Sequence, residues 1–406
     1  MGASPGIQDQ LITRSQQSLL FVTLMLGLLC QGLILTATAA VLPEMARDLG
    51  EGGEFVAQMS VGVGAFGLTL GAVASGSLLE RAGTRLLLLA ALVLYAIAGG
   101  AGFLLRAPVY LLASRFVAGF SASCVTTVCL WTVAAEYSGS KRARAFGVAG
   151  ALTGCAGMLS TIAGGCLAQH GGWPTAFVQY PLFGVVVFAL ACVSIRQVVP
   201  RHEHASPTVP NESRRLLPLY LVVWLLFAVT AIGGAQLPFL LRDEGLQDPG
   251  TRSLVLGVPT LAAALTSFCY GSLRRILDAR ETFTLAATCL ILGLATVGWS
   301  ATPAYAGTGA VLMGICVGLM GPCLYHVVAD RTDERSRGRQ MGWLNTAIFL
   351  GIFANPIVFA PMVAVLGAHH VFLLAALVIG TLALPLGRSV LRLAAGVDRS
   401  AHVTLV

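Results

Sequence analysis

Long apolar runs recur along this chain, and they constrain its fold more than any other feature. The first run extends from about Leu19 to Leu42. A run of about 18 or more apolar residues is long enough to cross the roughly 30 Å hydrocarbon core of a bilayer as a helix. Hydrophobic residues make up 56% of the chain and charged residues only 11%, which is too few to cover a water-facing surface. The sequence therefore predicts an all-α membrane protein.

Twelve such runs can be placed, which predicts twelve transmembrane helices. The first run is too long for the core of a signal peptide and has no evident cleavage site, so we expect it to remain as a helix. The predicted spans are residues 18–42, 55–79, 86–105, 108–135, 145–168, 174–196, 216–241, 253–273, 283–301, 305–329, 341–366 and 369–387.

The predicted spans form two groups of six, separated by a polar segment. Residues 197–215 contain three prolines and show no apolar periodicity, which is typical of a linker. The predicted organisation is a lead at 1–17, a six-helix bundle at 18–196, the linker at 197–215, a second six-helix bundle at 216–387 and a tail at 388–406.

Arginine and lysine fall mostly on one side of the predicted membrane. With the N-terminus inside, 20 of these 25 residues lie in cytoplasmic segments, and 4 lie in outer loops, namely Arg47, Arg106, Arg242 and Arg252. Short loops rich in basic residues stay in the cytoplasm. We therefore expect both termini to be cytoplasmic, in a bacterial inner (plasma) membrane.

Several residue patterns recur after 195 positions. A constant offset through loops and helices indicates that the chain contains two copies of one unit, an internal symmetry found in transporter folds. The offset relates Gly76-Ser77-Leu78 to Gly271-Ser272-Leu273, Leu42-Pro43 to Leu237-Pro238, Gly119 to Gly314, and Gly172 to Gly367.

The segment Gly76–Arg85 carries three charges between two apolar runs. It resembles the loop between the second and third helices of the major facilitator superfamily, with Glu80 where that family usually has Asp. The resemblance implies twelve helices in two pseudo-symmetric six-helix bundles, and a charged loop that gates access on the cytoplasmic side. The residues of this predicted gating loop are Gly76, Glu80, Arg81, Gly83 and Arg85, and Leu78 also matches.

Arg115 is the only charged residue well inside a predicted span. A buried arginine there costs on the order of 2.5–3.5 kcal/mol unless something compensates. The pattern Leu111, Arg115, Gly119 resembles the fourth-helix motif of the same superfamily. We expect Arg115 to bind an anion or to tune a proton site; the alternative is that it reaches outward or binds a neighbouring carbonyl.

The closest fit within the superfamily is its twelve-helix drug:proton antiporter branch. Gly164-Gly165 resembles the end of that branch's fifth-helix motif, but Thr161 stands where the motif has proline. In this superfamily, helices one, four, seven and ten line the central cavity. By that resemblance the candidates for substrate contact, with helix–helix packing as the alternative for each, are Gln31, Arg115, Trp224, Gln236, Tyr325 and His326.

Acidic side chains are absent from the middle of every predicted span, because all eighteen lie in loops or at helix ends. Coupling to protons would therefore use Glu44, Glu136 or His326, or the charge of the substrate itself. Of these three residues, His326 is the one that can titrate near neutral pH. An uncoupled transporter is the remaining alternative.

The expected function is secondary active transport of a small organic molecule by alternating access, in the form of proton-coupled efflux. The alternatives are uptake of an organic anion or other nutrient at Arg115, and a lipid-handling or sensory protein without solute turnover. No nucleophile–base set or metal-ligand spacing indicates an enzyme, so we expect neither a cofactor nor a metal. Charges spread over loops do not favour nucleic acid, and a monomer in the lipid bilayer is expected.

Overall fold

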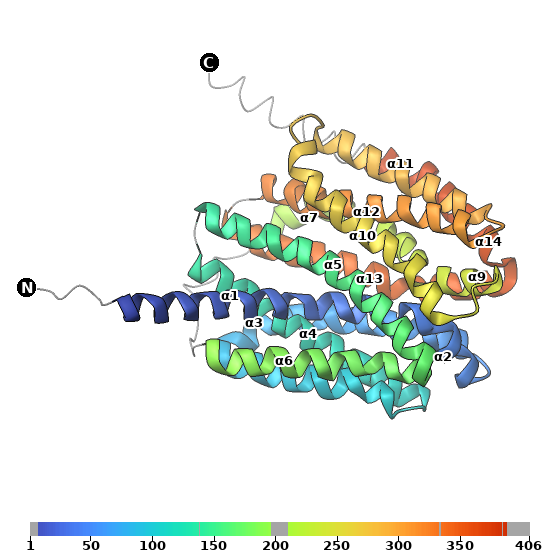
Figure 1. Ribbon diagram of the computed structural model, residues 1–406. Coiled ribbons are helices and arrows are strands. Elements are labelled where there is room, and N and C mark those ends of the chain that lie inside the picture. The colour runs from blue at the N-terminus through green and yellow to red at the C-terminus, as the bar shows by residue number, and fades with distance from the viewer. Residues whose placement is uncertain (1–6, 138, 196–209, 333, 384, 388–406) are drawn as a thin grey trace, which may run out of the picture.

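In the part of the chain that the computed structural model describes, helices are the only regular secondary structure, joined by short loops (Figure 1). That part comprises residues 7–137, 139–195, 210–332, 334–383 and 385–387. Within it, ten helical stretches are long and apolar enough to cross a membrane. The chain is thus an all-helical integral membrane protein, whereas the count of twelve spans stays a prediction.

The helices before the linker pack mainly on one another, as do those after it. The first group is α1 (Ile7–Thr36), η1 (Ala39–Val41), α2 (Leu42–Leu49), α3 (Gly53–Gly100), η2 (Ala101–Phe103), α4 (Pro108–Glu136), α5 (Gly139–Gly171), η3 (Trp173–Val178) and α6 (Gln179–Ser194). The second is α7 (Pro210–Thr230), α8 (Ile232–Ala235), α9 (Leu237–Asp243), α10 (Pro249–Leu273), α11 (Ala279–Gly298), α12 (Pro303–Asp330), α13 (Glu334–Leu366), α14 (Ala368–Val378) and the π-helical turn η4 (Ile379–Ala383). We call these groups the first and second halves.

The long helix α3 reverses direction at Gly83. This residue has φ 75° and ψ 172°, which lie far from helical values. The two ends of α3 meet, because α2 before it and η2 after it both pack against η3. The reversal therefore splits α3 into two antiparallel segments. We call the side of the molecule with this reversal the Gly83 end, and the opposite side, where α2, η2 and η3 meet, the Glu44 end.

Prolines interrupt the first long helix of each half. Proline lacks an N–H, and its ring clashes with the carbonyl group four residues earlier, so an α-helix cannot continue through it unchanged. α1 ends at Thr36, and η1 leads into α2, whose second residue is Pro43. α7 ends at Thr230, and α8 leads into α9, whose second residue is Pro238. The predicted spans 18–42 and 216–241 are therefore each built from several helical pieces.

Both of these helices begin earlier than the apolar runs predict. α1 begins at Ile7 and α7 at Pro210, so parts of the predicted lead and linker are helical. The apolar run defines only the part of a helix that lies in hydrocarbon, and polar turns continue it in water. Pro210 suits the first position of a helix, where a missing N–H costs nothing. The remainder of the lead, the linker and nearly all of the tail lie outside the described residues.

The 195-residue offset relates packing as well as sequence. Gly119 of α4 lies against the carbonyl oxygen of Gly64, and Gly314 of α12 lies against that of Pro259. Gly119 and Gly314 are 195 positions apart, and so are Gly64 and Pro259. A Cβ atom at either glycine would overlap a backbone carbonyl, so each half uses glycine for the same close helix contact.

The two halves meet along two helix pairs, α5 with α10 and α3 with α13. In the first pair, Gly165 leaves room for Ser253. In the second pair, the rings of Phe66 and Phe353 stack with centroids 4.8 Å apart. The interface between the halves thus combines small residues on one side with aromatic stacking on the other.

Replacement of Gly83 by alanine should destabilise the fold. Its φ and ψ lie in a region that is open to glycine almost alone, and a side chain there costs of order 1–3 kcal/mol. A thermal unfolding curve in detergent should show a lower midpoint for Gly83→Ala. Gly76→Ala is the matched control, because Gly76 is in a helix and a Cβ there meets nothing within 4 Å. Equal midpoints for the two variants would contradict the reversal at Gly83.

Candidate functional site

A cavity of about 260 Å³ lies between the two halves. The first half contributes α1, η1 and α5 to its wall, and the second half contributes α7 to α10 and α12. The lining residues are Leu35, Thr36, Ala39, Thr161, Thr230, Gly233, Gly234, Leu237, Leu256, Pro259, Thr260, Ala263, Ala310, Met313, Gly314 and Val317.

The wall of this cavity is apolar and uncharged. Its polar side chains are four threonines, and the other lining residues are aliphatic, glycine, proline or methionine. Thr36, Thr161 and Thr230 each donate their hydroxyl proton to the carbonyl group four residues earlier in the chain. These hydroxyl groups are therefore already bonded, and they offer a ligand only weak acceptor positions.

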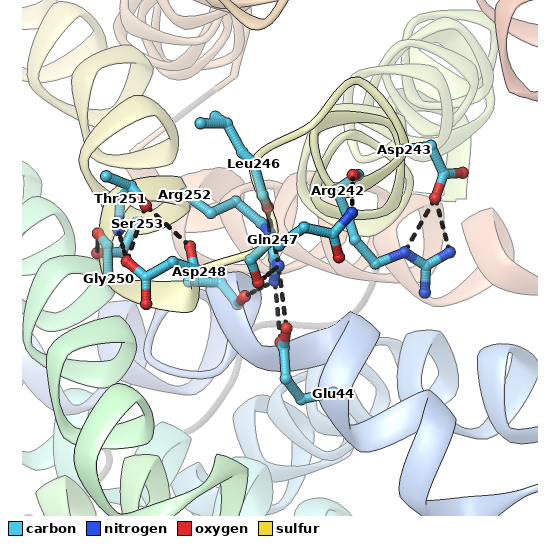
Figure 2. Close-up of polar contacts among 11 residues, drawn as sticks. Glu44, Arg242, Asp243, Leu246, Gln247, Asp248, Gly250, Thr251, Arg252 and Ser253 are labelled. Carbon is cyan, nitrogen blue, oxygen red and sulfur yellow. Dashed lines mark hydrogen bonds and ion pairs between the residues drawn. The ribbon is translucent and has the colours of Figure 1, made fainter.

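An ion pair joins the two halves at the Glu44 end (Figure 2). Arg252 of α10 donates from Nη1 and Nη2 to the two carboxylate oxygens of Glu44 in α2, each at 2.9 Å. The Arg252 side chain is fully buried, and the Glu44 side chain is 19% exposed. Leu256, one turn beyond Arg252, lines the cavity, so the ion pair lies directly next to it.

Arg252 also bonds to backbone carbonyl groups of both halves. Nη1 donates to the carbonyl oxygen of Ala40 at 2.8 Å, and Nη2 donates to those of Leu246 and Gln247. Nε donates to Leu246 as well. Every guanidinium nitrogen therefore has a partner, which is the condition under which a buried charge is tolerated.

Asp248 fixes the start of the helix that carries Arg252. Its carboxylate accepts hydrogen bonds from the backbone N–H and the hydroxyl group of Thr251, both at 2.8 Å. These hydrogen bonds hold the pKa of the Asp248 carboxyl below its usual value, and the bond from the backbone N–H of Thr251 has the larger effect. An N-cap of this kind places the next turn of α10, and Arg252 with it, in a defined position.

A pair of amides joins the halves beside the ion pair. Gln58 of α3 donates to the side-chain oxygen of Gln236 at 3.1 Å, and Gln236 donates back to that of Gln58 at 2.7 Å. Both residues are buried. Two polar contacts of different kinds, the ion pair and the amide pair, thus join the halves at the Glu44 end, and Leu237, next to Gln236 in the chain, lines the cavity. We refer to Glu44, Arg252, Gln58 and Gln236 together as the closure.

The structure does not bring the six predicted contact residues together at the cavity, since none of them is in its wall. Gln236 belongs to the closure. Tyr325 donates to the side-chain oxygen of Asn345 at 2.5 Å, and His326 pairs with Asp330 at 3.1 Å near the Gly83 end. Gln31 is half-buried, and Trp224 is 37% exposed.

Arg115 is buried inside the first half. Its Nη2 donates to the carbonyl oxygens of Ala98 and Gly99, and its guanidinium carbon lies 4.6 and 4.7 Å from the ring centroids of Phe177 and Tyr180. Its Nε and Nη1 have no hydrogen-bond partner among the described residues. The expectation that Arg115 binds an anion or tunes a proton site stays a prediction, and these contacts place it away from the cavity wall.

The predicted gating loop is helical up to its glycine. Gly76, Glu80 and Arg81 lie in the first segment of α3 and are exposed, and the chain reverses at Gly83. Arg85, in the second segment, donates to the carbonyl oxygen of Cys192 in α6 at 3.0 Å. The role of this loop as a gate stays a prediction.

Comparison with known proteins decides the family. The sequence profile described as Major Facilitator Superfamily matches residues 24–356 and 219–399. The chain belongs to the Major Facilitator Superfamily. This confirms the resemblance seen in the Gly76–Arg85 motif, and it makes the chain a transporter that carries small molecules across a membrane rather than an enzyme.

Two curated relatives show the same assignment. The Bacillus subtilis (strain 168) protein described as uncharacterized MFS-type transporter YdgK is 23% identical over 266 residues, which are 63% of this chain and 66% of that protein. The multidrug resistance protein MdtL of Shewanella sp. (strain ANA-3) is 24% identical over 293 residues, 67% of this chain and 73% of that protein. The second relative is consistent with the drug:proton antiporter branch.

Solved structures show the same fold. The nucleoside transporter NupG has a TM-score of 0.72 at 11% identity, covering 90% of this chain and 98% of that chain. The human organic anion transporter MFSD10 (TETRAN) has a TM-score of 0.65 at 19% identity, covering 91% of this chain and 99% of that chain. At these identities the likeness concerns the fold alone.

Replacement of Glu44 by glutamine should open the Glu44 end. The change leaves the buried Arg252 without a counter-charge, and loss of one partner of a buried ion pair costs about 3–5 kcal/mol. We expect the distance between spin labels at Glu51 and Ala301, both exposed at the Glu44 end of opposite halves, to shift toward longer values. The labels require a background without the exposed cysteines Cys155, Cys166 and Cys269.

The matched control for this experiment is Asp48→Asn. Asp48 pairs with Arg106 at 2.6 Å within the first half, and both side chains are at least half exposed. An exposed pair contributes only about 0–1 kcal/mol, so the label distance should not change. If Glu44→Gln left the distance distribution as in the wild type, the ion pair would not hold the halves together.

Proposed function

We propose that this protein is a secondary active transporter that exports a neutral, lipophilic small organic molecule by alternating access. The observation that carries the proposal is the uncharged wall of the central cavity. In this arrangement the two halves enclose the substrate between them and separate at one end at a time. The closure would then be the contact that must break for release at the Glu44 end.

The wall chemistry supports a neutral substrate. A charged group moved from water into apolar surroundings loses its hydration and needs a counter-charge or several hydrogen bonds. The cavity wall offers four threonine hydroxyl groups, three of them already bonded to backbone carbonyls. An apolar molecule with one or two donor groups fits these surroundings better than an organic cation or anion does.

Proton coupling is part of the proposal, with the titrating group outside the cavity. His326 and Asp330 pair near the Gly83 end, and Asp330 also lies 3.4 Å from Arg274. A proton on His326 strengthens its attraction to Asp330 and so competes with Arg274. This mode of coupling acts on the movement of the halves rather than on a group shared by proton and substrate.

The membrane and the orientation are inferred from charge. Twenty of the 25 basic residues fall in the segments that the sequence predicts to be cytoplasmic, and one of these segments is the reversal at Gly83. We therefore place the Gly83 end in the cytoplasm of a bacterium and the Glu44 end outside. The relatives named for multidrug resistance support export. A monomer contains the whole cavity, since both walls come from one chain.

A transport assay tests the proposal. Proteoliposomes with an imposed pH gradient should accumulate or lose neutral lipophilic compounds at rates that depend on the gradient, and should show much less transport of lipophilic cations and organic anions. The second candidate, uptake of an organic anion, gains support if anions are carried and if Arg115→Ala stops their transport while the variant still inserts normally. Absence of transport for all three classes would favour a lipid-handling or sensory role.

Replacement of Gly234 by leucine should reduce transport by filling the cavity. Gly234 lines the wall, and a Cβ there meets nothing within 4 Å, so a larger side chain extends into the empty space. We expect weaker binding of the best substrate, measured as a higher KM in proteoliposomes. Gly321→Leu is the control, because Gly321 is equally uncrowded but is not in the wall. Equal losses in both variants would show that the cavity is not the binding site.

A further inference from the structure

A second concave region lies on the outside of the first half. It is a groove of about 870 Å³ lined by residues of α1, α5 and α6. The helix α1 packs against both α5 and α6 and lies between them in Figure 1. Nothing in the proposed transport cycle uses it. We call it the α5–α6 groove, and its lining residues are Leu26, Leu29, Leu33, Ala156, Leu159, Ser160, Ala163, Cys166, Leu167, His170, Gln179, Leu182, Phe183 and Val186.

Apolar side chains dominate the groove and its rim. Leu159 and Leu182 are 65% and 67% exposed, and Val186 is 47% exposed. A concave apolar surface of this size facing water would be unusual for a folded protein. In a chain that crosses the bilayer, this face of α5 and α6 is turned toward lipid, so hydrocarbon is the medium that meets the groove.

The polar groups of the groove lie mainly at the Glu44 end. His170 is in the last turn of α5, and Gln179 is the first residue of α6. Gln179 accepts a hydrogen bond from Ser160 at 3.0 Å and donates to the carbonyl oxygen of Ala176 at 3.1 Å, so its amide is satisfied by the protein. Trp173 lies between them in the chain; its side chain is buried, and its ring nitrogen donates to Asp48 at 2.9 Å.

A cation lies against Trp173, in the segment that joins α5 to α6. The guanidinium carbon of Arg106 is 5.0 Å from the centroid of the Trp173 ring, and its side chain is 57% exposed. Arg106 donates to Asp48 at 2.6 Å. A guanidinium has five N–H donors, so this bond leaves further donors for an anionic oxygen. His170 donates from Nδ1 to the carbonyl oxygen of Cys166, which holds its ring at the groove.

The length of the groove matches one leaflet of a bilayer. Along α5 it extends from His170 to Ala156, which is about 21 Å at 1.5 Å per residue. Half of a bilayer of about 40–45 Å, headgroups included, is about 20–22 Å. Its volume also falls within the roughly 300–1,000 Å³ typical of ligand sites.

We propose that the α5–α6 groove is a binding site for one phospholipid of the leaflet at the Glu44 end. The acyl chains lie along α1 between α5 and α6, and the phosphate lies beside Arg106 and His170. The apolar wall accepts the chains, and the cation and the histidine at one end set the direction of the molecule. This site is separate from the central cavity and does not depend on which substrate the transporter carries.

Native mass spectrometry tests the site directly. The full chain is reconstituted in vesicles of phosphatidylethanolamine and phosphatidylglycerol, extracted in a mild detergent, and examined for bound lipid. The wild type should retain one phospholipid per chain, and Ala163→Trp, which fills the groove, should retain at least tenfold less. Val193→Trp is the matched control. Val193 is 77% exposed and lies on α6, one of the helices that line the groove, but it is not itself a lining residue.

A milder variant and a headgroup variant complete the experiment. Ala163→Leu fills part of the groove with little risk to folding, and it should show an intermediate loss if Ala163→Trp does not fold. Arg106→Gln should reduce retention severalfold while the apolar wall stays intact. Equal retention by the wild type and by folded Ala163 variants would overturn the proposal, and so would retention of an uncharged lipophile in place of a phospholipid.

Discussion

Hydrocarbon offers no partner to a backbone amide or carbonyl group, and this constraint shapes every element of the structure. Each membrane-spanning segment must satisfy its backbone internally, so the described chain is helical throughout. Interruptions occur where proline or glycine requires them and where other protein groups replace the lost bonds. At the break before Pro43, the carbonyl group of Ala40 accepts a hydrogen bond from Arg252 of the other half. A local break in one helix thus becomes a contact between the halves.

Much of this architecture follows from the sequence by simple physical rules. The lengths of the apolar runs place the helices, and the offset of 195 residues anticipates the paired contacts of Gly119 and Gly314. The helices α1 and α7 begin before the predicted spans, because hydropathy reports only the part of a helix that lies in hydrocarbon. The breaks before Pro43 and Pro238 cannot be predicted from hydropathy either, because an apolar run does not distinguish one continuous helix from three short pieces.

The candidate site was harder to predict, because its wall contains no charged or amide side chain, and those are the side chains that are conspicuous in an apolar sequence. Arg115 is conspicuous as a lone charge, yet the carbonyl groups of Ala98 and Gly99 and two aromatic rings surround it inside one half. Arg252 was counted as an outer-loop charge, although its side chain is fully buried between the halves. The residues around these arginines in the chain do not predict either outcome. The carbonyl partners of Arg115 are 16 and 17 positions away, and the partners of Arg252 in the other half, Glu44 and Ala40, are 208 and 212 positions away. Gln236 is a predicted substrate contact, with helix–helix packing as the alternative, and the structure pairs its amide with that of Gln58, a residue that the sequence analysis does not single out.

The chemistry of the closure suits a contact that must form and break repeatedly. Burial removes hydration from Glu44 and Arg252, and this loss offsets most of their mutual attraction, so a complete buried pair adds little net stability. When the halves separate, both side chains regain water, and neither is left charged and unpaired in an apolar place. An apolar contact of the same area would lose stability on opening without any such compensation. The ion pair therefore gives the closed state a defined geometry while the free energies of the closed and open states stay close. When that difference is small, binding of the substrate or of a proton can shift the balance between the two states.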